Sequence, residues 1–250
     1  MTVNSKKINT PLFMLFIFAA TVSFLSGCSG QVKKKQASNY NAELGVRYLQ
    51  KGHLKLANDK LEKALKQNPN SVQSNHYYAI LQQRLKNNGK ATQYFLKAIS
   101  IDPKDPELRN NYGSFLCETK RPQAAVHQFL IAVKDPLYST PAFAYSNAGI
   151  CLRKANDPAR AEKYFRLALE KNPTFPSALL GMAKIYKDKK DYSKAQAFML
   201  RYESVGKSTP DALSLCVTIN KKMRNNAKAS ACKSTLLRLF PSSAEAMKTH

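Results

Sequence analysis

The five cysteines and four histidines of this chain are its main candidates for catalysis or metal binding. Cys28 stands before any segment with a foldable pattern, and the other cysteines, Cys117, Cys151, Cys216 and Cys232, lie far behind it. None of them forms a CxxC pair or a Cys/His cluster with the spacing of zinc ligands, so we expect no metal site. The histidines are dispersed, and none belongs to an HExxH-type pair.

Other catalytic patterns are missing from the sequence as well. It contains no GxSxG motif, no glycine-rich phosphate loop and no acidic pair at the spacing of a catalytic pair. Its carboxylates are scattered along helical stretches, where such side chains usually face solvent. We therefore predict that the protein is not an enzyme, and we expect no catalytic residue, no cofactor and no small-molecule substrate.

The N-terminal segment has the pattern of an export signal. Lys6 and Lys7 are followed by the uncharged apolar run PLFMLFIFAATVSFL over residues 11–25, and then by the small residues of SGC. A short transmembrane anchor is the alternative interpretation, but the run falls short of the ~20 apolar residues that a bilayer requires. We therefore predict a signal peptide over residues 1–27.

The four residues LSGC, which end at Cys28, resemble the lipobox of bacterial lipoproteins. The resemblance implies that Cys28 becomes the first residue of the mature protein and carries lipid on its sulfur and its amine. Several acyl chains anchor a protein stably, whereas one chain binds only marginally. In Gram-negative lipoproteins an aspartate after the cysteine tends to mean inner-membrane retention, so Ser29 implies the periplasmic face of the outer membrane. The polar, basic residues that follow predict a flexible tether over residues 28–38.

The net charge of +24 is unusually basic for a chain of 250 residues, and it falls to +22 when Lys6 and Lys7 leave with the signal peptide. In a cytoplasmic protein this charge would suggest nucleic acid. Export removes most of that argument, so we expect no nucleic-acid partner. The lysines favour acidic lipid headgroups or an acidic partner surface, and a simple solvated basic exterior is an equally open interpretation.

A repeat begins near Asn39 and continues through the rest of the chain. Small, large and proline residues recur every 34 residues, with one spacing of 36 that indicates a two-residue insertion near DPLYSTP. A period of 34 with these residue types is the tetratricopeptide pattern. The recurring residues are Ala57, Leu61, Ala64 and Pro69; Ala91, Phe95, Ala98 and Pro103; Ala125, Phe129, Ala132 and Pro136; Ala161, Phe165, Ala168 and Pro173; and, in two weaker units, Ala195 with Met199 and Ala229 with Pro241.

The repeat predicts an all-α fold, a right-handed superhelical solenoid of about six helix pairs over residues 39–250. Each pair buries its apolar face only against its neighbours. Small residues let the two helices of a pair approach, and the prolines end each second helix. The predicted units are approximately 38–71, 72–105, 106–141, 142–175, 176–209 and 210–243.

The binding chemistry of such a solenoid lies in its concave groove, which the first helix of each pair lines. With Gly45 as the reference, helical spacing places one stripe of side chains inward in each unit. The first two units offer apolar centres with polar margins, which suits an extended or helical peptide, and ordinary packing between repeats is the alternative. The predicted groove residues are Asn39, Ala42, Val46, Leu49, Gln50, Gln73, His76, Ile80, Gln83 and Arg84.

The later units make the groove more basic. The fourth unit contributes Arg153 and Lys154, and the fifth contributes Lys184 and Lys187. A basic groove end could receive acidic side chains or a C-terminal carboxylate. The pattern does not match the clamp that binds chaperone tails in the cytosol, so the ligand of this end stays open.

The four later cysteines form an even number, which in an exported protein suggests disulfides. Cys117 and Cys151 follow the small residues of their helices by four and two positions, so their directions differ by roughly 160° and the two can meet between stacked first helices. We predict this disulfide, worth about 2–4 kcal/mol. Cys216 and Cys232 fall in the two antiparallel helices of the last unit, where a disulfide and two buried thiols both remain open.

Nearly the entire mature chain resembles the type IV pilus biogenesis and stability lipoproteins called PilF or PilW. The resemblance lies in NNYGSFLCETKRPQAAVHQFLIAVKDPLY, NAGICLRKANDPARAEKYFRLALEKNP, LRYESV and FPSSAE, together with the lipobox and the six repeats. The sequence departs from the family in its weak fifth and sixth units, where KKMRNNAKAS is more basic.

This resemblance implies a pilotin, a protein that binds subunits of the pilus secretin and promotes their delivery to the outer membrane or their assembly there. The implied partner is a PilQ-like secretin subunit, and the implied contact with the membrane is the N-terminal lipid. A periplasmic adaptor that recruits peptidoglycan hydrolases would have the same fold and anchor and is the alternative function.

Overall fold

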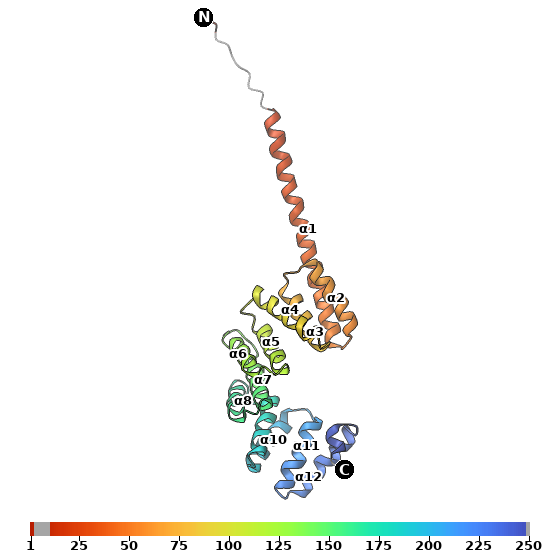
Figure 1. Ribbon diagram of the computed structural model, residues 1–250, viewed down its shortest axis with the longest axis vertical. Coiled ribbons are helices and arrows are strands. Elements are labelled where there is room, and N and C mark those ends of the chain that lie inside the picture. The colour runs from red at the N-terminus through yellow and green to blue at the C-terminus, as the bar shows by residue number, and fades with distance from the viewer. Residues whose placement is uncertain (3–10, 249–250) are drawn as a thin grey trace. The chain divides into compact units, whose positions relative to one another are not determined.

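The computed structural model describes the backbone of residues 1–2 and 11–248 and the side chains of residues 1–2 and 31–248. Within these residues it has thirteen helices and no strand (Figure 1). The helices are α1 (Pro11–Gln50), α2 (Leu54–Gln67), α3 (Val72–Arg84), α4 (Asn88–Ile101), α5 (Pro106–Glu118), α6 (Pro122–Ala132), α7 (Pro141–Lys154), α8 (Pro158–Lys171), α9 (Pro176–Asp188), α10 (Tyr192–Val205), α11 (Pro210–Lys222), α12 (Asn226–Leu239) and α13 (Ala244–Met247).

The first helix is much longer than the others and includes the predicted tether. Residues 31–36 are helical and exposed, where we expected a flexible segment, and packing begins at Ser38, whose hydroxyl donates to the carbonyl of Ala64 at 2.9 Å. A helix that is fixed at one end extends at little cost through residues that do not break it. Lys6 and Lys7 lie outside the described residues, as does the side chain of Cys28.

The searched helices contain no membrane-spanning candidate. In the part of the chain that the structure describes, none combines the length and the apolar character needed to cross a bilayer.

The chain divides into two compact units, residues 1–103 and residues 104–250. In the first unit α1 packs along α2 and α3 packs along α4, and both helices of the first pair contact α3. In the second unit the pairs are α5 with α6, α7 with α8, α9 with α10, and α11 with α12. The short helix α13 contacts both helices of the last pair.

Small residues on the first helices make room for large residues on the second helices, as the repeat predicts. A Cβ atom added to Gly45 would lie 2.6 Å from Leu61 Cγ, one added to Gly113 would lie 2.7 Å from the Phe129 ring, and one added to Gly149 would lie 2.7 Å from the Phe165 ring. Such distances are well inside van der Waals contact, so any larger residue at these positions would force its neighbour to shift.

The turn inside each helix pair shows the repeat most clearly. One residue in each turn has a positive φ between 59° and 78°. Its amide and the next one donate back to carbonyls near the end of the first helix, which is the Schellman arrangement. The six residues are Gly52, Lys86, Lys120, Asn156, Lys190 and Arg224, spaced by 34 except for the step across the insertion.

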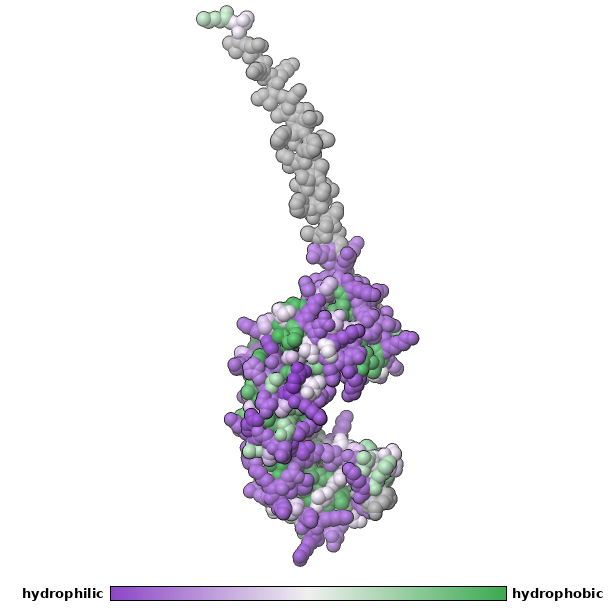
Figure 2. All heavy atoms as spheres, in the orientation of Figure 1, coloured by the Kyte–Doolittle hydropathy of each residue, from purple (hydrophilic) through white to green (hydrophobic). Residues whose placement is uncertain are grey.

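The all-α tetratricopeptide fold is thus confirmed, with α13 as a small addition. Six helix pairs are present in the described residues. Hydrophilic side chains cover most of the repeat surface in Figure 2, with small hydrophobic patches between them.

Candidate peptide-binding groove

The exposed face of α1 and α3 in the first unit carries most of the predicted groove. Val46, Ile80 and Gln83 are half-buried there. The outer positions are exposed: they are Asn39, Gln50, Gln73 and Arg84. Half-buried aliphatic side chains bordered by amides and a guanidinium form a surface on which a peptide can bury apolar side chains and satisfy its backbone.

Three predicted groove residues lie in the core instead. Ala42, Leu49 and His76 are 0%, 3% and 4% exposed, too little to contact a ligand. Ala42 lies on the stripe that contains Ser38 and Gly45, and this stripe faces the second helix of its pair. His76 is the equivalent residue of the next unit, with its ring 6.2 Å from that of Phe95. The prediction was wrong because these positions turn toward the second helix.

Leu49 belongs to the apolar core beneath the groove. It clusters with Leu61, Tyr78 and Leu81, all at most 5% exposed. Its carbonyl, near the end of α1, accepts a 2.6 Å hydrogen bond from the Arg84 guanidinium. Carbonyls in the last turn of a helix lack intrahelical partners. Arg84 therefore joins the C-terminal ends of the two groove helices and presents the rest of its side chain at the surface.

Buried polar side chains fix the helices of the first unit. The Asn41 amide donates to Ala37 O and to Gln67 Oε1, both at 2.9 Å. The Asn75 amide donates to Pro69 O at 2.9 Å and to Ser71 O at 2.7 Å. Buried hydrogen bonds of this kind are costly to leave unmade. They tie α1 to the C-terminal end of α2, and the start of α3 to the loop that follows α2.

Tyr78 adds a further link between α3 and α2. Its hydroxyl donates to Glu62 Oε1 at 3.0 Å, and its ring meets the Tyr94 ring edge-on at 4.6 Å. Burial raises the pKa of Tyr78 well above its ordinary value, and the adjacent Glu62 carboxylate raises it further. The phenol therefore stays neutral and keeps its proton available for Glu62.

Tyr40 is an exposed aromatic residue of α1 that sequence reasoning missed. It is 64% exposed and points about 100° away from Asn39 around the helix, outside the predicted groove. Exposed aromatic side chains are frequent anchors for partners. The signal was available, because the first helix of a solenoid has no preceding repeat to cover its outer face.

The second unit places its four cysteines in two disulfides. Cys117 of α5 is bonded to Cys151 of α7, with their Cα atoms 5.6 Å apart. The Asn147 amide donates to Asn110 Oδ1 at 3.0 Å between the same two helices. One covalent bond and one hydrogen bond therefore fix consecutive first helices beside the two-residue insertion.

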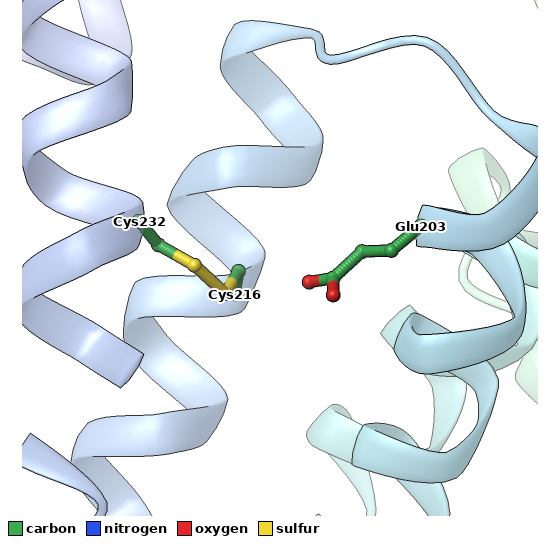
Figure 3. Close-up of side chains that lie close together, drawn as sticks. All are labelled: Glu203, Cys216 and Cys232. Carbon is green, nitrogen blue, oxygen red and sulfur yellow. A yellow bond between two sulfur atoms is a disulfide. The ribbon is translucent and has the colours of Figure 1, made fainter. Parts of the chain in front are cut away.

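The other disulfide joins Cys216 of α11 to Cys232 of α12, with Cα atoms 6.2 Å apart. The Glu203 carboxylate points toward it from α10 (Figure 3). Together these residues bring one potential ligand atom each within 4.8 Å of one another. A metal binds thiolates, which a disulfide does not offer, so we assign this group a structural role.

Three tetratricopeptide repeat profiles match the chain, at residues 43–106 with 116–174, residues 94–127, and residues 152–219. The chain is 28% identical over 242 residues to the type IV pilus assembly protein PilF of Pseudomonas aeruginosa. The match covers 95% of this chain and 96% of that protein. The crystal structure of PilW, described as a widely conserved type IV pilus biogenesis factor, is 33% identical with a TM-score of 0.77, over 86% of this chain and 98% of that one. The chain belongs to the PilF/PilW family.

A second solved structure of the PilF/PilW family supports the same assignment. The structure of Pseudomonas aeruginosa PilF is 28% identical with a TM-score of 0.76, and covers 87% of this chain and 98% of that one. The resemblance seen in the sequence is confirmed, and with it the assignment to tetratricopeptide-repeat proteins of type IV pilus biogenesis. Tetratricopeptide scaffolds are typically non-enzymatic and act through protein–protein contacts.

Proposed function

We propose that this protein is an outer-membrane lipoprotein that acts as a pilotin. In this proposal it binds pilus secretin subunits through the groove of α1 and α3 and promotes their outer-membrane delivery or their multimerisation. The observation that carries the proposal is the pair of half-buried aliphatic side chains, Val46 and Ile80, at equivalent positions of two adjacent first helices.

The groove has the features of a peptide site on a rigid support. Its aliphatic centre is bordered by Asn39, Gln50, Gln73 and Gln83, whose amides can both donate and accept hydrogen bonds. The core and the buried hydrogen bonds beneath it hold the helices before a ligand arrives. A preformed surface costs little conformational entropy on binding, which raises affinity.

The lipid on Cys28 supplies the membrane address in this mechanism. Attachment to the outer membrane confines the groove to a thin layer and raises the local concentration of captured secretin subunits there. Linked binding events gain affinity through effective concentration without any new contact. The secretin subunits therefore meet one another at the membrane into which they insert.

The proposal is tested by removing the protein from cells and by removing only its lipid. Deletion should abolish secretin multimers, measured in isolated outer membranes, and surface pili, measured on whole cells. A Cys28→Ala variant should accumulate in the periplasm or inner membrane and fail to restore outer-membrane multimers. Normal multimers and pili in the deletion strain would contradict the pilotin role and favour an adaptor for cell-wall enzymes.

A further inference from the structure

A second candidate binding site lies in the second unit, on the first helices of the last three repeats. There α7, α9 and α11 line an open surface cavity of about 260 Å³. Its charged lining consists of Arg153 on α7, of Lys184, Lys187 and Asp188 on α9, and of Asp211 on α11.

The charges of this cavity do not balance. Three cationic and two acidic side chains line it, so one positive charge is in excess. Lys184 forms an ion pair with Asp211, and Lys187 forms one with Asp188. Among the ion pairs in the described part of the chain, none includes Arg153. The excess charge is therefore the guanidinium of Arg153.

A guanidinium binds a carboxylate with two parallel hydrogen bonds, so the group that best neutralises Arg153 is one carboxylate. The rest of the lining suits this ligand. Ser214 contributes a hydroxyl that can donate to a carboxylate oxygen, and Leu215, only 7% exposed, contributes an apolar part of the wall.

We propose that this cavity binds the free C-terminal carboxylate of a partner polypeptide whose last residues are not acidic. A run of acidic side chains would bring several negative charges against Asp188 and Asp211, which already occupy the two lysines. A chain that ends in the cavity brings one charge and continues away from these acids. Its terminal side chain lies against Leu215, and its carboxylate lies against Arg153.

The site is separate from the groove proposed for the secretin. It lies in the second compact unit and shares no residue with α1 or α3. A variant of this cavity can therefore fail to bind a chain terminus while secretin multimers form normally, and the two proposals are tested independently.

The test uses the full-length protein in neutral detergent and a dye-labelled six-residue peptide of Gly, Ser and Ala that ends in Leu. Fluorescence anisotropy compares the free C-terminal acid with the matched C-terminal amide. We expect the acid to bind at least about tenfold more tightly, because the amide cannot neutralise Arg153. Binding should weaken as salt screens the charges. Equal binding of acid and amide would overturn the proposal.

Variants of Arg153 locate the binding. Arg153→Gln should weaken binding of the acid by about tenfold or more, and Arg153→Lys should retain part of it, since an ammonium keeps the charge but loses the bidentate geometry. Arg238→Gln removes the same charge from α12 outside the cavity and should leave binding unchanged. Circular dichroism confirms that each variant is folded. Equal losses in Arg153→Gln and Arg238→Gln would overturn the assignment.

Two further probes separate this ligand from other anions. An amidated peptide of four glutamates should bind less tightly than the free acid. Vesicles containing phosphatidylglycerol should bind Arg153→Gln and Arg238→Gln equally well. Tighter Arg153-dependent binding of the glutamate peptide would replace the chain terminus by an acidic segment. A selective loss of vesicle binding in Arg153→Gln would replace it by a lipid headgroup. Either result overturns the proposal.

Discussion

The two compact units stabilise the same repeat by different means. The first unit, residues 1–103, uses buried polar side chains, such as Ser38, Asn41 and Asn75, that bond to backbone carbonyls. The second unit, residues 104–250, uses two disulfides, and ion pairs join its later helices. The small and large residues of the repeat thus determine how the two helices of a pair pack. The additional hydrogen bonds, disulfides and ion pairs between helices can differ from one unit to the next.

The exposed faces of the two units differ in the same way. At equivalent positions of their first helices, both helices of the first unit, α1 and α3, carry an aliphatic residue, Val46 and Ile80. In the second unit only α7 does, with Ile150, whereas the other three first helices carry polar or charged residues, namely Ser114, Lys184 and Thr218. The first unit therefore offers an aliphatic surface with amide borders, and the second offers a charged cavity. One scaffold can therefore present two unlike surfaces without any change in its backbone plan.

The largest predicted effect on stability comes from the disulfide between α5 and α7. Replacing Cys117 and Cys151 together by serine opens a loop of 34 residues, which should lower the free energy of unfolding by about 3–4 kcal/mol. Hydrogen exchange followed by mass spectrometry should show lost protection in residues 104–250 only. An equal loss in residues 39–103 would contradict the expectation that this disulfide stabilises only the unit that contains it.

Glycine-to-alanine variants test whether side-chain packing is stiffer in the second unit than in the first. A Cβ atom on Gly181 would clash with Cζ of the rigid Phe165 ring, and one on Gly45 would clash, at 2.6 Å, with Cγ of Leu61, an aliphatic side chain with no ring. We expect Gly181→Ala to cost roughly 1–3 kcal/mol and Gly45→Ala less. Urea unfolding of both variants measures the difference. Similar costs would show that the aromatic packing of the second unit is no stiffer.

The ion-pair cluster around Glu162 should make the second unit sensitive to acid. Burial opposes the charge of Glu162, but hydrogen bonds from Lys189, Arg166 and Tyr186 outweigh it and hold its pKa at about 2, below the ordinary 4.5. A carboxyl with a lowered pKa stabilises the fold above pH 4.5 and loses this contribution as pH falls toward 2.

Glu162→Gln should therefore cost roughly 1–2 kcal/mol at pH 7 and flatten the acid limb of the stability profile. Thermal unfolding between pH 7 and pH 3 measures both effects. Glu170→Gln on the same helix is the control for a lost charge. If the two variants share one pH profile, the cluster does not contribute.

The smallest predicted effect is a gain in stability at the turns inside the helix pairs. Lys86 and Lys190 have φ values of 62° and 61°, a region that is unfavourable for side chains with a Cβ. Lys86→Gly and Lys190→Gly should each stabilise their own unit by up to about 1 kcal/mol, since glycine adopts this conformation freely. Lys60→Gly, inside α2, should instead destabilise. A loss of stability at both turn positions would contradict this account.

Much of the fold could be predicted from the sequence because the repeat is periodic. Ala57, Ala91 and Pro69 identify the helix pairs by spacing alone, and the step of 36 locates the insertion. The turn residues were harder to see, since glycine occupies the left-handed position only in the first of the six turns, at Gly52, and the tertiary structure imposes that conformation on lysine, asparagine or arginine in the others.

The groove could be predicted only in part. Spacing predicts which face of α1 and α3 lines the groove, and Val46 and Ile80 on that face are half-buried, as a binding surface requires. It does not separate groove positions from positions four residues away on the same helix. Ala42 and His76 were therefore assigned to the groove with Val46 and Ile80, although they face the second helix. Arg153, Lys184 and Lys187, which line the basic cavity, were predicted from the sequence as a basic groove end. The ion pair between Lys184 and Asp211 joins two repeats and has no signal in the sequence of either.

The role of the groove in secretin assembly is tested by the amount of secretin multimer in cells that carry Val46→Glu and Ile80→Glu together. Ile150→Glu is the matched control, because Ile150 is half-buried at the equivalent position of α7 in the second unit. We predict that the double variant, folded by circular dichroism, loses the multimers while the control retains them. Multimers at the normal level in the double variant, or an equal loss in the control, would contradict the proposed groove.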